Sequence, residues 1–214
     1  MKFTMLGLII SGFIIAGAQE PKPLIKNPSL YRTIDTTSER SRLEGITGAG
    51  VGNIIFSTRD LPLNQEKTYT DLRDTFYVET DTSLFCCAYF PGTLGSLAGI
   101  IKSQYPGAKF LELWAELVTT APEGESLSYS RQWQGPLADK ENWDKLYFRL
   151  LPYFGSQKND FVPLDLSKYP RAAGTSVITI KLFLKFDIGA VLDFPTPSVK
   201  NFLVAWGTFF WVRR

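Results

Sequence analysis

The chain has 214 residues, a hydrophobic content of 44% and a formal net charge of +2. This length suits one β-rich domain with an arm, and the small net charge excludes long-range steering of the whole molecule towards nucleic acid. The sequence contains no histidine, which excludes Ser-His-Asp and Cys-His catalysis and removes the commonest neutral metal ligand. We therefore expect a protein that is not an enzyme.

The first eighteen residues have the pattern of a secretory signal peptide. One lysine precedes an apolar run over residues 5–15, and three small residues, 16–18, precede Gln19. The run is too short for a comfortable transmembrane helix. Two interpretations stay open. Residues 1–18 are removed during secretion, or they remain as a hydrophobic arm that packs on a neighbouring subunit or contacts a membrane through residues 3–16.

Residues 19–48 are predicted to form an extended arm, because they contain three prolines and show no sustained period of a helix or a strand. The arm is weakly basic, so it is either a solvated linker or a segment that lies on nucleic acid or on a partner subunit. In the second case the candidate nucleic-acid-binding residues are Lys22, Lys26, Arg32, Arg40 and Arg42.

The glycine-rich segment 48–53 superficially resembles a phosphate-binding loop. It lacks the Gly-Lys-Ser/Thr ending of such loops, and no crossover helix is predicted after it. We interpret it as a lead-in to the first strand.

Beyond this point the sequence predicts short strands separated by turns. Alternating or continuously apolar runs cover residues 52–58, 75–81, 83–90, 109–120, 126–133, 145–154 and 176–189. A last segment, 201–212, is apolar enough for an eighth strand or for a buried tail. The clearest is 176–189, in which apolar residues at even positions share one face over the whole length. In 109–120, the same alternation places Leu111, Leu113, Ala115 and Leu117 on one side.

One helix is predicted over residues 95–104. Leu97, Ile100 and Ile101 follow helical spacing, and Tyr105 and Pro106 end the segment. About eight strands with turn punctuation and a single helix are typical of an all-β sandwich, barrel or jelly roll.

Few residues are candidates for chemistry. The only cysteines, Cys86 and Cys87, are neighbours that point to opposite faces of a strand, so we expect two buried thiols and no disulfide between them. Pairs of carboxylates that could serve acid–base chemistry or calcium all lie in turns, where aspartate is favoured for backbone reasons. These pairs are Asp71 and Asp74, Asp139 and Glu141, and Asp160 and Asp165.

The order of elements around the helix carries a resemblance. In "AYFPGTLGSLAGIIKSQYPGAKFLELWAELVTTAPEGESLSYSRQW", a strand ends in a Pro-containing loop, and a short helix and a Tyr-Pro-Gly break lead into a long strand. In "GTSVITIKLFLKFDIGAVLDFPTPSV", a long alternating strand closes on a Pro-rich end. Over about residues 50 to 198 this pattern resembles the jelly-roll coat proteins of small icosahedral RNA viruses, of the sobemovirus and tombusvirus kind. The arm departs from that family because it is hydrophobic and then only mildly basic.

The resemblance implies an eight-stranded jelly-roll β-sandwich over residues 49–198, with one short helix and an extended N-terminal arm. It implies a structural subunit that self-assembles into an icosahedral virus shell, located in the virion, with identical subunits and RNA as partners. No cofactor is expected; if calcium binds, its candidate ligands are Asp160 and Asp165. The alternatives are a secreted β-sandwich binding or adhesion protein and, third, a secreted carbohydrate-active enzyme that uses two carboxylates.

The apolar C-terminal tail, residues 199–214, would be costly to expose on a monomer. We therefore expect it to lie between subunits. The candidate interface residues are Phe202, Trp206, Phe209, Phe210 and Trp211.

Overall fold

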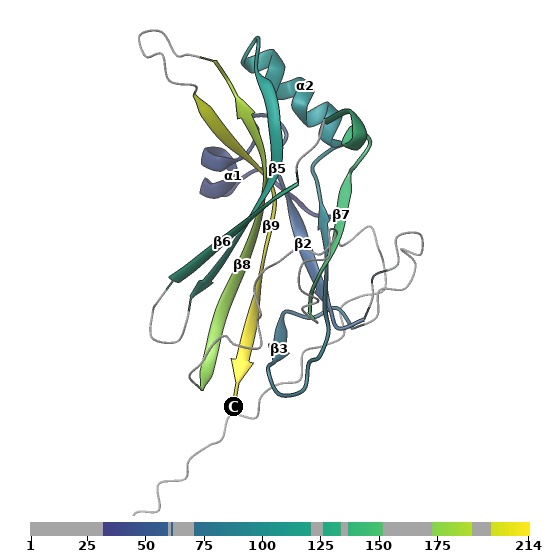
Figure 1. Ribbon diagram of the computed structural model, residues 1–214, viewed down its shortest axis with the longest axis vertical. Coiled ribbons are helices and arrows are strands. Elements are labelled where there is room, and N and C mark those ends of the chain that lie inside the picture. Colours follow the sequence, from purple (N-terminus) through teal and green to yellow (C-terminus); the bar gives the residue numbers. More distant parts are fainter. Residues whose placement is uncertain are drawn as a thin grey trace, which may run out of the picture.

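The structure, a computed structural model, describes residues 32–59, 61, 71–120, 126–133, 137–151, 173–189 and 198–214. This part of the chain is mostly β-strand, which confirms the all-β prediction (Figure 1). The elements are β1 (Ile34–Asp35), α1 (Glu39–Glu44), β2 (Val51–Ser57), β3 (Thr75–Tyr77), β4 (Leu84–Tyr89), α2 (Leu94–Gln104), β5 (Lys109–Thr120), β6 (Ser126–Trp133), η3 (Leu137–Lys140), β7 (Lys145–Leu151), β8 (Gly174–Asp187) and β9 (Val199–Arg213).

Each of the eight predicted strands is present. Three short elements, β1, α1 and η3, were not predicted; the first two lie in the segment that we expected to be an extended arm. The C-terminal segment, for which the sequence left both a strand and a buried tail open, forms β9, which pairs with β8 along its whole length. Most of its apolar residues are therefore buried within their own chain.

The strands form one curled, mixed sheet in the order β6-β5-β8-β9-β2-β4-β7, with β1 paired to β2 and β3 paired to β9. The strand β2 joins the two halves of this order. Its first part pairs with β9 only at Gly52 and Asn53, and its second part pairs with β4 from Ile54 to Ser57. The sheet therefore folds over itself at β2, and the two halves face each other (Figure 1).

Two glycines permit the strands to approach closely where the sheet folds over itself at β2. A Cβ atom on Gly52 would lie 1.9 Å from the carbonyl oxygen of Tyr89, and one on Gly207 would lie 2.7 Å from the carbonyl oxygen of Ile54. No larger residue fits at Gly52 unless the backbone moves.

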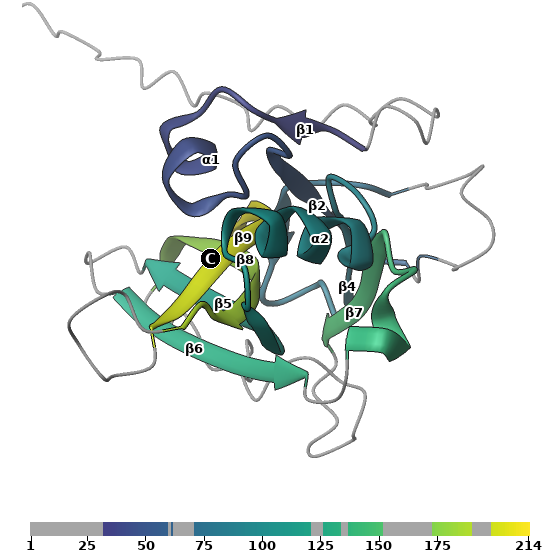
Figure 2. The ribbon, with the colours of Figure 1, turned by 90° about the horizontal axis from the view of Figure 1, so that it is seen from above.

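The main core lies between the two halves of the sheet. The even-numbered apolar residues of β8 from Ile178 to Phe186 are buried, as predicted, and they face the buried residues of β2, β4 and β7. The helix α2 closes one end of this core (Figures 1 and 2). It buries Leu94, Leu97, Ala98 and Ile101.

The ends of α2 are set by local hydrogen bonds. The Thr93 hydroxyl accepts a hydrogen bond from the Ser96 amide at 3.2 Å, so Thr93 is the N-cap and the helix begins at Leu94, one residue before the predicted start. At the other end, the Tyr105 amide donates to the carbonyl of Ile101 at 2.8 Å. The helix predicted over residues 95–104 is therefore confirmed.

The strand β5 departs from strict alternation. A register shift between Phe110 and Glu112 leaves Leu111 43% exposed, so the prediction that it shares a buried row with Leu113 was wrong. A bulge inserts one residue into a strand and turns the side chains before it to the other face. Here it brings Glu112 opposite Lys185 of β8.

The two cysteines lie on opposite faces of β4, as predicted. Cys86 belongs to the main core, whereas Cys87 packs with Leu72 and Tyr89 on the other side, and both thiols are free. Burial raises the pKa of Cys87 to about 12 and raises the pKa of Cys86 well above its ordinary value.

Candidate functional site

The outer face of β5, β8 and β9, which points away from the main core, has two dissimilar halves. Cross-strand pairs in the half nearer α2 carry charges and aromatic rings, whereas those in the half near the C-terminus carry neither charge nor amide groups. We call the first the covered half, because α1 lies over it, and the second the uncharged face.

In the covered half, each lysine of β8 is matched with a glutamate. Lys185 Nζ lies 2.7 Å from Glu112 Oε1 and 4.8 Å from the centre of the Trp114 ring. Lys181 Nζ lies 3.6 Å from Glu116 Oε2. These charges are neutralised within the sheet.

The short helix α1 adds contacts from above this half. Its Glu44 carboxylate lies 3.5 Å from Lys181 Nζ, and its Arg40 guanidinium lies 4.6 Å from the centre of the Trp206 ring. Beneath the helix, Val51, Phe183 and Leu203 form a small buried cluster. A helix of six residues does not form alone in water, so these tertiary contacts are needed to hold it.

A compact turn before α1 sets its position. The Asp35 carboxylate accepts hydrogen bonds from the backbone amides of Thr37 and Ser38 at 2.9 and 3.0 Å. Hydrogen bonds from the Ser38 side chain and amide, followed by the Thr37 amide, lower the pKa of Asp35 to about 2. The Ser38 hydroxyl in turn accepts from the Ser41 amide at 3.0 Å and caps the helix.

The uncharged face lies at the end of the sheet away from α2 and spans four neighbouring strands (Figure 1). Its side chains are hydroxyl-bearing, β-branched or aromatic, and none is ionised at neutral pH. Register places the following residues on it: Thr75, Tyr77, Val118, Thr120, Thr175, Val177, Thr179, Thr208, Phe210 and Val212.

Within the described residues this face remains open. Val177 and Phe210 are 36% and 39% exposed, although both are large apolar side chains in the middle of a cross-strand row. The hydroxyls of Thr179 and Thr208 share one hydrogen bond at 3.1 Å, in which either can be the donor. Covering these two hydroxyls therefore costs less than covering two unpaired polar groups.

Charged groups border the uncharged face. On the side of the covered half the nearest are Glu116 and Lys181. At the C-terminal side, the Arg214 guanidinium lies 4.7 Å from the centre of the Tyr77 ring, and its amide donates to Glu79 Oε1 at 3.1 Å. An apolar centre with a charged rim is the usual anatomy of a protein–protein interface.

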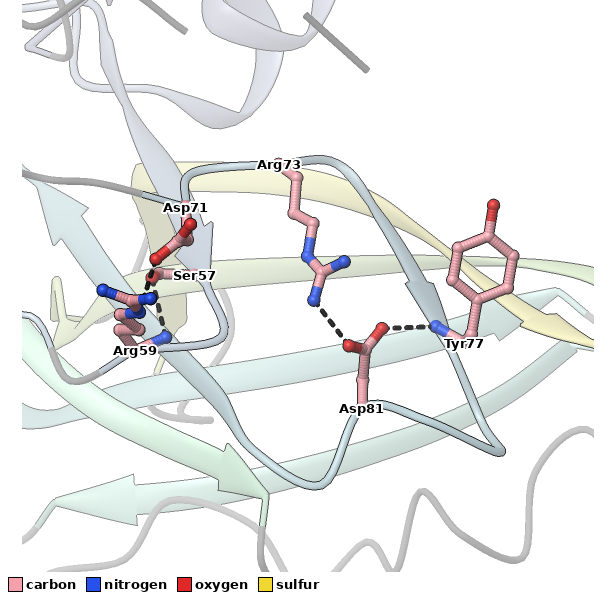
Figure 3. A network of polar contacts seen from close by, with 6 residues as sticks. All are labelled: Ser57, Arg59, Asp71, Arg73, Tyr77 and Asp81. Carbon is pink, nitrogen blue, oxygen red and sulfur yellow. Dashed lines mark hydrogen bonds and ion pairs between the residues drawn. The ribbon is translucent and has the colours of Figure 1, made fainter. Parts of the chain in front are cut away.

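A polar network holds β3, the outermost strand of this face, in place (Figure 3). The Asp81 carboxylate accepts from Arg73 Nη2 at 2.5 Å and from the Tyr77 amide at 2.7 Å. Nearby, Arg59 Nε lies 2.6 Å from Asp71 Oδ2. These contacts close the loop that carries β3 and fix it against β9.

The predicted nucleic-acid-binding residues are not gathered on one basic surface. Lys22 and Lys26 lie outside the described residues. The Arg32 guanidinium donates to the Asp144 carboxylate at 3.1 Å and to the Phe90 carbonyl at 3.2 Å. Arg40 is engaged by Trp206, as described above, and Arg42 lines a separate hollow beside α1.

The calcium candidates Asp160 and Asp165 also lie outside the described residues. In the part that the structure describes, no three cysteine or carboxylate side chains are grouped as metal ligands would be. Of the other carboxylate pairs, Asp71 is paired with Arg59, and Asp74 Oδ1 accepts from the Thr75 hydroxyl at 3.0 Å.

The predicted interface residues divide by strand alternation. Phe202, Phe209 and Trp211 are 2%, 0% and 1% exposed within their own chain, so they have no surface to offer a neighbour. Trp206 is half-buried beneath Arg40, and only Phe210 lies on the uncharged face. The other members of the face were missed, although the uncharged alternation Thr175, Val177 and Thr179 at the start of β8 was a visible signal.

Neither helix of the described residues has the length and apolar character needed to cross a bilayer. Comparison with known proteins gave no match to any protein family, any curated protein or any solved structure.

Proposed function

We propose that this chain is a self-assembling structural subunit that contacts further copies of itself through the uncharged face. The observation that carries the proposal is the uncharged face itself, with Val177 and Phe210 exposed at its centre and charges only at its rim. An uncharged surface of a sheet that exposes two large apolar side chains is a surface that other protein can cover.

The finer form of the proposal is a jelly-roll coat subunit that builds an icosahedral shell around a genome. Its support is the order strand, Pro-containing loop, helix, break and long strand, which is present as β4, α2 and β5. A shell of identical subunits requires a rigid sandwich with repeated contacts rather than a catalytic pocket.

The size of the face sets the strength of one contact. Ten residues, each taking about 4.8 Å across the strands and about 6.7 Å along them, cover about 300 Å² per copy. Two copies then bury about 600 Å², below the 1,200 Å² or so of a stable interface. One such contact is weak, so assembly is expected to depend on concentration and on further contacts between the same subunits.

The test uses two valine-to-lysine variants of the full chain. Val177 lies at the centre of the face, whereas Val199, which is 47% exposed, lies at the other end of the sheet at the start of β9. Both side chains reach solvent, so a lysine at either position leaves the monomer folded, which circular dichroism checks. Sedimentation velocity over a concentration series, with negative-stain microscopy of the fastest species, measures assembly.

We expect the wild-type chain and Val199→Lys to associate as concentration rises, and Val177→Lys to remain monomeric over the same range. A wild-type chain that stays monomeric at every concentration, salt and pH would refute self-assembly. Equal association of both variants would show that copies meet through another surface. Closed shells in the micrographs would support the coat form, whereas open or irregular particles would restrict the proposal to self-association.

A further inference from the structure

A hollow of about 400 Å³ lies between α1 and the turn that follows it, apart from the uncharged face. Thr36, Ser41, Arg42, Ile46, Thr47, Gly48 and Gly50 line it, and none of these described lining residues is acidic. The volume falls in the range of small-ligand sites. The lining therefore combines one cation, several hydroxyls and exposed backbone.

Arg42 differs from the other arginines whose side chains the structure describes, all of which, Arg149 and Arg213 included, have a contact. Arg32, Arg59 and Arg73 each have an ion pair, and Arg40 and Arg214 lie over aromatic rings. Arg42, which is exposed, has no side-chain hydrogen bond, ion pair or ring contact within the described residues. Even Glu39, three residues earlier on the same helix, forms no ion pair with it in this part of the chain.

The walls of the hollow are held in place by hydrogen bonds. The Ser41 hydroxyl donates to the Asp35 carbonyl at 2.6 Å, and Gln104 Nε2 donates to the Thr47 carbonyl at 3.1 Å. Gly50 has a φ of 77°, and a Cβ atom there would lie 2.7 Å from the Asp35 carbonyl oxygen. The turn can therefore pack tightly against the strand only because this residue is glycine.

We propose that this hollow binds a phosphate group. The guanidinium of Arg42 presents five N–H donors in a planar fork that matches two oxygens of a phosphate. The hydroxyls of Thr36 and Thr47, which have no partner in the described residues, supply further donors. The hollow is larger than one phosphate, so it accommodates the remainder of a phosphate ester or of a nucleic acid backbone.

The test measures binding of radiolabelled inorganic phosphate to the full chain by equilibrium dialysis, which works whether or not copies assemble. The binding variant is Arg42→Glu, and the matched control is Lys102→Glu, which makes the same charge change at an exposed residue in the last turn of α2. A third variant, Arg42→Lys, keeps the charge but removes the fork. A short oligouridylate replaces phosphate in a second series.

We expect saturable binding of one phosphate per chain, weakened about tenfold or more by Arg42→Glu, partly by Arg42→Lys and not by Lys102→Glu. Tighter binding of the oligonucleotide, with an affinity that falls as salt rises, would assign the site to a nucleic acid backbone. Tighter binding of inorganic phosphate would assign it to a free phosphate or a phosphomonoester. Non-saturable binding, or equal loss in Arg42→Glu and Lys102→Glu, would overturn the proposal.

Discussion

The strongest test of the fold is a pair of glycine-to-alanine substitutions with effects of opposite sign. Gly52 lies where β2 passes from β9 to β4, and a methyl group there would lie 1.9 Å from the Tyr89 carbonyl oxygen. Gly99 lies on the exposed side of α2, and a methyl group there would meet nothing within 4 Å. Gly52 does not have a positive φ, so glycine is needed there only because a side chain would clash with the neighbouring strand.

The magnitudes follow from these surroundings. Overpacking typically costs about 1–3 kcal/mol, and the Gly52→Ala clash involves backbone that cannot rotate away, so about 3 kcal/mol is expected. Alanine is favoured over glycine inside a helix by about 0.5–1 kcal/mol, so Gly99→Ala is expected to stabilise the protein. For a chain of this size, 1 kcal/mol shifts the Tm by about 2–4 °C. The Tm should fall by about 6–12 °C in Gly52→Ala and rise by about 1–4 °C in Gly99→Ala.

Thermal unfolding followed by circular dichroism at low protein concentration measures both shifts, and urea unfolding provides the free energies. A Gly52→Ala variant as stable as the wild-type chain would show that β2 and β4 do not approach as closely as the structure has them. A Gly99→Ala variant that is less stable than the wild type would refute the placement of that residue on an open helix surface.

Two further predictions concern titratable groups. Because burial raises the pKa of both Cys86 and Cys87, iodoacetamide at pH 8 should modify neither thiol in the native protein and both in urea; mass spectrometry checks this, and modification without unfolding would contradict it. Because hydrogen bonds lower the pKa of Asp35 from 3.8 to about 2, its contribution to the turn before α1 is present above pH 3.8 and lost as the pH falls towards 2. The Ser38 amide resonance should therefore titrate near pH 2, and in Asp35→Asn it should not titrate; a midpoint near pH 4 in the wild type would show that the carboxylate is unbonded.

Much of the fold could be predicted because its strands and α2 have local signals. Each of the eight predicted strands has a period of two or a continuous apolar run, and both are properties of neighbouring residues. The three missed elements, β1, α1 and the four-residue η3, have no such signal. The strand β1 has two residues, and α1 has six residues whose stability comes from the Asp35 turn and from contacts with Trp206 and Lys181.

The candidate sites were less accessible to prediction than the fold. Phe209, Phe210 and Trp211 look alike in the sequence, but only Phe210 points outwards, because β9 lies between β8 and β3 and its neighbouring side chains alternate between the core and the outer face. Leu111 was misplaced because a bulge shifts β5 by one residue before the regular alternation begins. Neither the outward direction of Phe210 nor the bulge at Leu111 can be read from composition or from spacing alone.

Local alternation was sufficient to place eight of the nine strands, α2 and the buried row of β8, because successive side chains of a regular strand point to opposite faces. The tertiary structure decided which outward-facing rows are charged and covered by α1 and which rows remain open. The uncharged face exists because pairing aligns residues of four strands that are far apart in the chain. The hollow beside Arg42 likewise depends on how a six-residue helix and a glycine turn pack together.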